Sequence, residues 1–93
     1  MEKEFLIMSQ IRKLNDSVNI IGTNLKKYRK LKDYSQEDLC RELDLLGLPM
    51  HKADIYEIEN NKRLVKDFEL KAFCMALKIS ADDLLDDTEK FFG

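Results

Sequence analysis

The amino-acid content of this 93-residue chain favours helix almost everywhere. Leucine occurs 14 times and valine twice, and the chain holds only three glycines and one proline. Leucine is a strong helix former, valine favours strands, and glycine and proline interrupt helices. We therefore expect an all-α fold. The length fits one small domain, and a hydrophobic content of 44% is enough for a single core.

The charge and cysteine content exclude several classes of protein. Sixteen basic and eighteen acidic residues give a net charge of −2, so the total charge does not indicate a polyanionic partner. Cys40 and Cys74 are too few for a disulfide scaffold, and neither has another cysteine or histidine at metal-ligand spacing. The apolar run at residues 5–8 is too short for a signal peptide or a membrane span. We expect a cytoplasmic protein with no metal, no cofactor and no membrane contact.

Apolar periodicity predicts a first helix after Gly22, with Thr23 or Asn24 as its cap and with Leu25, Tyr28 and Leu31 along one face. Its other face holds the densest basic run in the chain, which is also typical of a solvated helix face. The run consists of Lys26, Lys27, Arg29, Lys30 and Lys32.

The next two helices are separated by a turn near residues 46–50. Ser35 and Asp38 form a capping box at the start of the second helix. Its apolar face carries Leu39, Leu43 and Leu46. The sequence Gly47-Leu48-Pro49 then interrupts the helical pattern. A third helix is expected over residues 52–60, with Ile55 and Ile58 inward, and Asn61 is a plausible left-handed residue at its end.

Two further helices complete the expected core. Asp67 is the expected cap of a fourth helix, and Ser80 and Asp83 are expected to cap a fifth. The apolar residues of these helices are Leu70, Phe73, Cys74, Leu77, Leu84 and Leu85. Residues 1–18 have the pattern of one more amphipathic helix, with Ile7, Ile11 and Leu14 on one face.

This order of elements resembles the Cro/phage-repressor (XRE-type) helix-turn-helix family. The match includes Leu25, Arg29 and Leu31, the run 34–40 (Tyr-Ser-Gln-Glu-Asp-Leu-Cys), and the run 55–63 (Ile-Tyr-Glu-Ile-Glu-Asn-Asn-Lys-Arg), and continues through Leu70, Leu77, Ser80, Leu84 and Leu85. The resemblance implies a five-helix, lambda-repressor-like domain over residues 20–87. An N-terminal extension, residues 1–19, would precede it, and a tail, residues 88–93, would follow it.

The resemblance also implies a sequence-specific DNA-binding regulator, repressor-like in type, whose third helix enters the major groove. The residues expected to contact bases are His51, Lys52, Ala53, Tyr56 and Glu57. Those expected to contact phosphates are Ser35, Gln36, Asn60, Lys62 and Arg63. Arg29 and Glu59 match a structural ion pair between the first and third helices. The implied partners are double-stranded DNA, a second copy in a homodimer, and a second regulatory protein. The dimer interface would use either residues 85–92 or residues 5–14.

Three departures from the family pattern leave another function open. About five additional residues stand between Leu43 and Ile55, which predicts a longer second helix or a wider turn. Asn61 replaces the usual glycine and Cys40 the usual alanine, so we interpret Cys40 as a small packing residue. The third helix is acidic, with Asp54, Glu57 and Glu59 against Lys52. The alternative is a protein-interaction module, such as an antitoxin or adapter. An enzyme is not expected, because His51 has no partner at catalytic spacing.

Overall fold

The computed structural model describes residues 11–92 and shows an all-α architecture over that range. Its α-helices are α2 (Gly22–Leu31), α3 (Gln36–Leu45), α4 (Lys52–Glu59), α5 (Asp67–Leu77) and α6 (Ala81–Leu85), followed by a 3-10 helix, η1 (Glu89–Phe91). Within the described range, an isolated bridge between Leu14 and Ser17 is the one β-type pairing. The expected all-α fold with five helices in the domain is confirmed.

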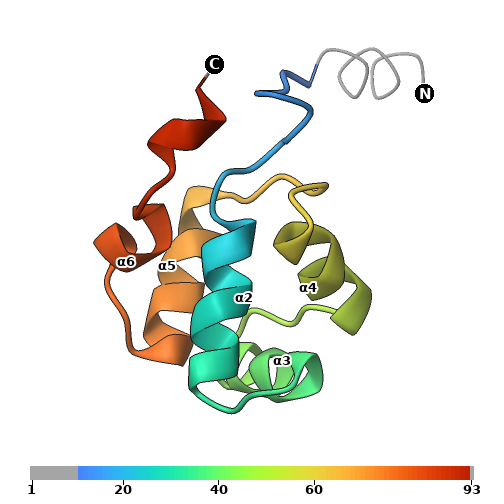
Figure 1. The fold of residues 1–93 in the computed structure, drawn as a ribbon. Helices are drawn as coiled ribbons and strands as arrows, with labels where there is room; N and C mark the ends of the chain where they lie inside the picture. Colours follow the sequence, from blue (N-terminus) through green and yellow to red (C-terminus); the bar gives the residue numbers. More distant parts are fainter. Residues whose placement is uncertain (1–10, 93) are drawn as a thin grey trace, which may run out of the picture.

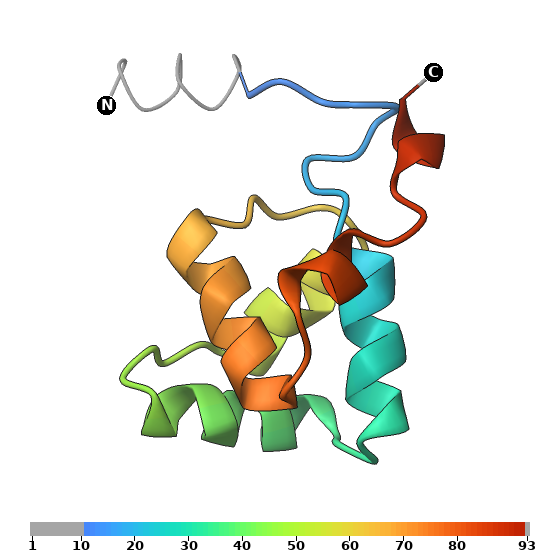
Figure 2. The same ribbon diagram turned by 90° about the vertical axis from the view of Figure 1, so that its left-hand side faces the viewer.

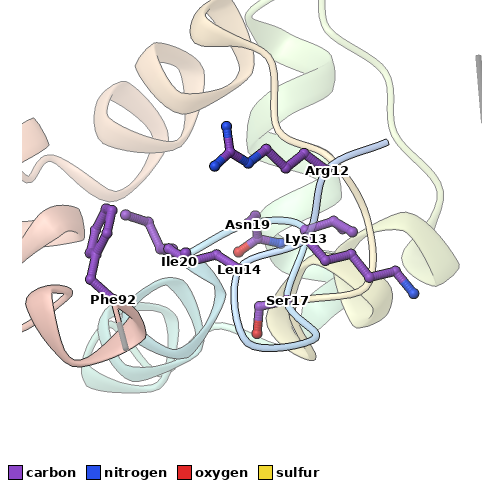
Figure 3. A pocket seen from close by; sticks show the side chains of 8 residues that line it. Arg12, Lys13, Leu14, Ser17, Asn19, Ile20 and Phe92 are labelled. Carbon is purple, nitrogen blue, oxygen red and sulfur yellow. The ribbon is translucent and has the colours of Figure 1, made fainter. Parts of the chain in front are cut away.

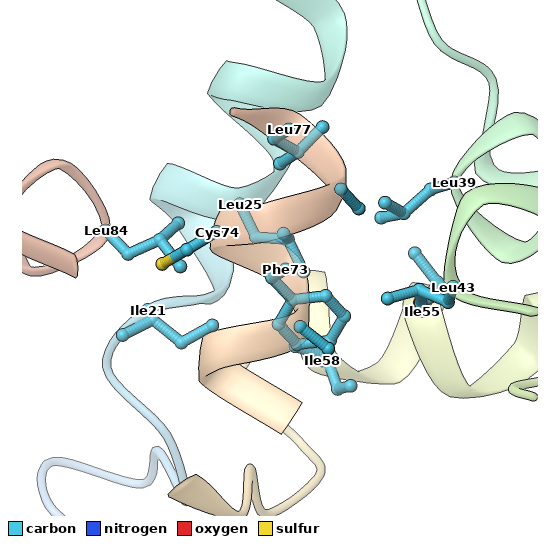
Figure 4. Packing of buried hydrophobic residues seen from close by; sticks show 12 residues of the cluster. Ile21, Leu25, Leu39, Leu43, Ile55, Ile58, Phe73, Cys74, Leu77 and Leu84 are labelled. Atoms are coloured by element: carbon cyan, nitrogen blue, oxygen red, sulfur yellow. The ribbon is translucent and has the colours of Figure 1, made fainter. Parts of the chain in front are cut away.

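The helices surround one hydrophobic core. Helix α4 packs against α2 and α3, α5 packs against α2 and α3, and α6 contacts α2 and α5 (Figure 1). The fully buried side chains come from all five α-helices: Leu25, Leu39, Leu43, Ile55, Ile58, Phe73, Leu77 and Leu84 (Figure 4). The predicted inward positions of α4 and most of those of α5 are therefore confirmed.

Both predicted capping boxes are present. The Ser35 hydroxyl accepts a hydrogen bond from the Asp38 amide at 3.0 Å, and the Asp38 carboxylate accepts one from the Ser35 amide at 2.8 Å. Ser80 and Asp83 make the same exchange at the start of α6. Both boxes use residues three positions apart, so the local sequence suffices to form them.

The predicted caps of α2 and α5 were wrong. Helix α2 begins at Gly22, and the acceptor for the amides of Ile21 and Gly22 is the side-chain oxygen of Asn19. Asn24 instead donates to the carbonyls of Leu84 and Asp86, each at 2.8 Å. Asp67 is the first residue of α5 rather than its cap.

Some apolar positions were also misplaced. Leu31, Leu46 and Leu85 are 68%, 42% and 40% exposed, because each lies at the end of its helix, beyond the residues that the core covers. The predicted N-terminal helix lies mainly outside the described residues. In the part described, the chain around Leu14 is not helical: Leu14 and Ser17 exchange backbone hydrogen bonds around Asn15 and Asp16, which have positive φ angles.

Left-handed residues follow both α3 and α4, and the one after α4 is the predicted Asn61. Gly47 (φ 81°) follows α3, within the predicted turn, and Asn61 (φ 62°) follows α4. In each case the next amide bonds back into the helix, from Leu48 to the Leu43 carbonyl and from Lys62 to that of Glu57. These are the bonds of the Schellman motif. Of the additional residues after Leu43, Asp44 and Leu45 belong to α3, and the others form a wide turn before α4.

The N-terminal segment before α2 runs up to the C-terminal tail, on the side of the molecule where α2 begins (Figure 2). We call residues 14–19 the N-terminal strap, and its Asn15 side chain donates to the carbonyl of Phe91. A pocket between the strap and the tail is lined by Leu14, Ile20 and Phe92, among others (Figure 3). In residues 11–92, no helix has the length and apolar character that crossing a membrane requires.

Candidate nucleic-acid interface

The outer face of α4 is exposed and carries mainly polar side chains. Its inner face is fixed by Ile55 and Ile58, which are fully buried. The helical period then directs the residues between and before them to solvent. All five residues predicted to contact bases are exposed there: His51, Lys52, Ala53, Tyr56 and Glu57. His51 precedes the first turn of α4, and its amide donates to the Asp54 carboxylate at 3.0 Å.

A buried ion pair fixes the inner side of α4. Arg29 Nε lies 2.6 Å from Glu59 Oε2, and Arg29 Nη2 lies 3.1 Å from Glu59 Oε1. The two side chains are only 8% and 2% exposed. Arg29 Nη1 also donates to the Tyr34 carbonyl at 2.7 Å. The predicted Arg29–Glu59 pair is confirmed, and it joins α2, the turn before α3, and α4.

The N-terminus of α3 lies beside this pair. Gln36 is the first residue of α3, and its side-chain amide donates to Glu59 Oε1 at 3.1 Å. Ser35 is exposed, and its hydroxyl is used in the capping box. The start of α3 and the end of α4 are therefore adjacent, although 23 residues separate Gln36 from Glu59. Amide groups at a helix N-terminus favour an anion at such a position.

A second ion pair connects α3 and α4 on the outside. Lys52 Nζ lies 2.8 Å from Glu37 Oε1, and these side chains are 62% and 60% exposed. The hydrogen bond and charge of Lys52 lower the pKa of Glu37, and those of Glu37 raise the pKa of Lys52. The one basic residue on the outer face of α4 is thus neutralised by an acid from α3.

The loop after α4, residues 60–63, contains three of the predicted phosphate-contacting residues. Lys62 is exposed, and the Asn60 side chain donates to the Tyr56 carbonyl at 2.8 Å. Arg63 forms a two-pronged bond to Glu69, with both nitrogen–oxygen distances at 3.1 Å. Its Nε also lies 3.5 Å from Asp54. The guanidinium of Arg63 is thus already paired within the chain.

The Glu69 carboxylate also caps α5, accepting from the Lys66 amide at 2.9 Å. Burial on its own would raise the pKa of Glu69. The hydrogen bonds from Arg63 and the Lys66 amide, with the charges of both residues, outweigh this effect, and the pKa is lowered.

Sequence reasoning missed three residues that shape this surface. Asn19 and Glu69 are buried polar residues, with partners that lie up to 44 positions away in the chain. Gly22 lies so close to α4 that a Cβ there would come within 1.9 Å of the Ile58 carbonyl oxygen. The signal for Glu69 was present, since it stands three residues after Lys66, at the position of a capping acid. Asn19 and Gly22 gave no comparable local signal.

The cysteines have the environment of packing residues. Cys74 is buried and Cys40 is half-buried against the core. Burial raises the pKa of both thiols, which keeps them protonated at neutral pH and therefore weakly nucleophilic. Over residues 11–92, no three histidine, cysteine or acidic side chains gather in a way that would hold a metal ion.

The arrangement of α3 and α4 agrees with a comparison of the sequence with protein families. A family model described as helix-turn-helix matches residues 25–84, which is more than half of the chain. The matched region begins within α2 and ends within α6. No curated protein and no solved structure matches the chain.

Proposed function

Since the chain belongs to the XRE/Cro-type helix-turn-helix family of DNA-binding domains, we propose that it is a sequence-specific transcriptional regulator, repressor-like in type, that places α4 in the major groove. The observation that carries this proposal is the outer face of α4. Its five predicted base-contacting residues are all exposed, whereas its inner face is anchored by apolar packing and the Arg29–Glu59 pair. A helix held in this way presents fixed side chains to a groove.

The outer face of α4 offers three kinds of base contact. Lys52 can donate to the O6 and N7 of guanine, and Glu57 can accept from the N4 of cytosine. Ala53 can contact a thymine methyl group. His51 and Tyr56 complete the face and supply further hydrogen-bonding groups. For Lys52 to reach a base, its bond to Glu37 must break, so we expect a guanine contact to replace that ion pair.

The phosphate contacts are assigned to the two ends of this surface. Ser35 and Gln36 lie at the α3 N-terminus, and Asn60, Lys62 and Arg63 lie in the loop after α4. Lys62 is the strongest candidate for counterion release, because it is exposed and its ammonium is in none of the ion pairs of residues 11–92. Arg63 is already neutralised by Glu69 and Asp54, so we expect it to contribute less.

We expect the regulator to act in the cytoplasm as a homodimer on an inverted repeat, with half-sites about one helical turn apart. An apolar side chain at the tail supports self-association, since Phe92 is 64% exposed beside the pocket that it lines with Leu14 and Ile20. Sedimentation equilibrium of the wild type and of Phe92→Ser is the test. Dissociation of the variant at concentrations where the wild type is dimeric supports an interface at the tail, and an unchanged dimer places it elsewhere.

Two variants test the division of roles. Lys52→Ala should cost about 1–3 kcal/mol of binding to a palindromic duplex selected by the wild type, with little change on random DNA. Lys62→Ala should weaken both duplexes alike and should reduce the slope of log K against log salt by about 0.9. Fluorescence anisotropy titrations at several salt concentrations measure both quantities. Equal losses for the two variants on both duplexes would contradict the assignment.

A second candidate function, a protein-interaction module, is favoured by one observation. Leu45 is 81% exposed, and a groove close by is lined by Leu46, Phe68 and Met75, among others. An apolar surface of this kind is typical of a protein partner. If neither selected nor random DNA binds at low salt, this second function replaces the first.

A further inference from the structure

We propose that Asn19 is a positioning residue for the DNA interface: through its side chain, the N-terminal strap sets the geometry of the phosphate-contacting loop at residues 60–63. This inference rests on the proposed DNA binding. It adds to the interface a residue that the comparison with known families does not cover, since the matched region begins at residue 25.

The Asn19 side chain is buried and uses its full hydrogen-bonding capacity. Its Nδ2 donates to two carbonyls, that of Ile58 at 3.1 Å and that of Arg63 at 2.8 Å. Its Oδ1 accepts from the amides of Ile21 and Gly22 and from the side chain of Asn61. Because a buried amide that lost these partners would be costly, the arrangement specifies one geometry.

These bonds connect two distant parts of the chain. The Oδ1 side of Asn19 caps the start of α2, whereas the Nδ2 side holds the end of α4 and the loop beyond it. The backbone of the strap adds two more connections, since the Val18 amide donates to the Asn61 carbonyl at 3.0 Å and the Asn61 side chain donates to the Asn19 carbonyl at 3.1 Å. Figure 3 shows Asn19 in the strap, between Ser17 and Ile20.

The part of the fold that carries this loop has a fixed geometry. Gly22 lies against the Ile58 carbonyl so closely that any side chain would displace α4. The start of α2 and the end of α4 therefore have a defined separation, and Asn19 spans it. Because close-packed residues cannot be compressed, a shift of one of these segments would move the other.

Lys62 is placed by this arrangement. Its neighbours on both sides, Asn61 and Arg63, are bonded to Asn19, and its own amide donates to the Glu57 carbonyl at 2.9 Å. The Lys62 side chain remains exposed. A phosphate contact requires a donor at a defined place along the DNA backbone, and a contacting group is most effective when its supporting residues are locked. Asn19 supplies that support without touching DNA.

Asn19→Asp separates this role from the capping of α2. A carboxylate keeps the acceptor for the amides of Ile21 and Gly22, but it has no donor for the carbonyls of Ile58 and Arg63. The control is Leu84→Val, which reduces stability by removing one buried methylene in α6, outside the strap and the loop. Both proteins are to be compared with the wild type at a temperature at which all three are folded by circular dichroism.

The first measurement is binding to a random-sequence 20-base-pair duplex as a function of salt. For Asn19→Asp we expect a loss of affinity of about tenfold and a salt slope lower by about 0.9, the value for one phosphate contact. Leu84→Val should keep the slope of the wild type. If Asn19→Asp also keeps that slope, the proposed role is overturned.

The second measurement is amide hydrogen exchange of residues 60–63, which does not depend on DNA. Asn19→Asp should lose protection at Asn61 and Lys62, whose amides bond to the Ile58 and Glu57 carbonyls, and Leu84→Val should retain it. Equal protection in the two variants overturns the positioning role. If the wild type binds no DNA but the exchange differs as expected, the proposed function fails, whereas the structural link between strap and loop remains supported.

Discussion

Two of the ion pairs of helix α4, one on its inner side and one on its outer side, differ mainly in their burial. The Arg29–Glu59 pair is buried and shares its carboxylate with Gln36. The Lys52–Glu37 pair has a similar separation, 2.8 Å, but both of its side chains are about 60% exposed. The inner pair links three segments of the fold, whereas the outer pair joins single side chains across the surface.

The difference indicates which pair can be exchanged during binding. Breaking a buried pair leaves a charge without solvent or partner, which is costly, whereas an exposed pair contributes little because water replaces the partner. The inner pair therefore maintains the position of α4, and the outer pair can open when a nucleic acid offers Lys52 another acceptor. One helix thus combines a fixed inner side with an adaptable outer side.

The largest effect is expected from breaking the inner pair. Glu59→Gln should lower the free energy of unfolding by about 3–5 kcal/mol, because Arg29 stays buried without a counter-charge. Urea denaturation measures the loss. The double variant Arg29→Met, Glu59→Met should recover part of it, since no isolated charge remains. A loss below about 1 kcal/mol in the single variant would place this pair in the same class as the outer one.

An intermediate effect is expected at the partly buried Arg63–Glu69 pair. Glu69→Gln should cost about 1–3 kcal/mol near pH 7, because Arg63 loses its ionised partner. The folded-state pKa of Glu69 is lowered, so its contribution is present above its unfolded-state value of about 4.3 and is lost as the pH falls further. The stability difference between wild type and variant should therefore shrink below that pH.

Chemical denaturation at several pH values between 3 and 7 measures this dependence. Asp67→Asn is the matched control, because Asp67 is an exposed acid in the same first turn of α5. It should cost less than about 1 kcal/mol. A pH-independent difference between Glu69→Gln and the wild type would contradict the proposed contribution of the pair.

The smallest effect on stability is expected from breaking the outer pair. Glu37→Gln should leave the free energy of unfolding almost unchanged, yet it should raise affinity for random DNA roughly two- to tenfold at low salt. The reason is that the variant frees Lys52 and removes a negative charge beside the expected phosphates. Glu89→Gln, an equal charge change at the tail, should leave DNA affinity nearly unchanged. Equal gains in DNA affinity for the two variants would show that net charge alone causes the effect, and would contradict the role given to Lys52.

The features that sequence reasoning predicted correctly are local. The capping boxes at Ser35 and Ser80, and the left-handed residue Asn61, involve residues within a few positions of one another. The inward position of Ile58 follows from helical periodicity. The Arg29–Glu59 pair is long-range, and it was accessible only through the resemblance to a family.

The features that could not be predicted depend on contacts between distant segments. Asn24 has the right chemistry for a cap, but it donates to the carbonyls of Leu84 and Asp86 at the end of α6, and Asn19 takes its place. Arg63 has the sequence signature of a phosphate ligand, and the structure shows its charge engaged by Glu69. No spacing rule connects Asn24 or Asn19 to its partners, because tertiary packing brings them together. Arg63 and Glu69 are six positions apart, and they meet where the loop after α4 leads into α5. The base and phosphate contacts themselves stay predictions.

The wide turn between α3 and α4 is a position at which the length of the chain can be changed. A Cβ placed on Gly47 would meet no atom within 4 Å, so this part of the turn borders open space. The far end of α4 is anchored away from this turn, where Glu59 meets Arg29 and Ile58 meets Gly22. Insertions or deletions in the turn should therefore leave the far end of the helix in register, and loop grafting there offers a way to redesign the surface around His51 without rebuilding the domain.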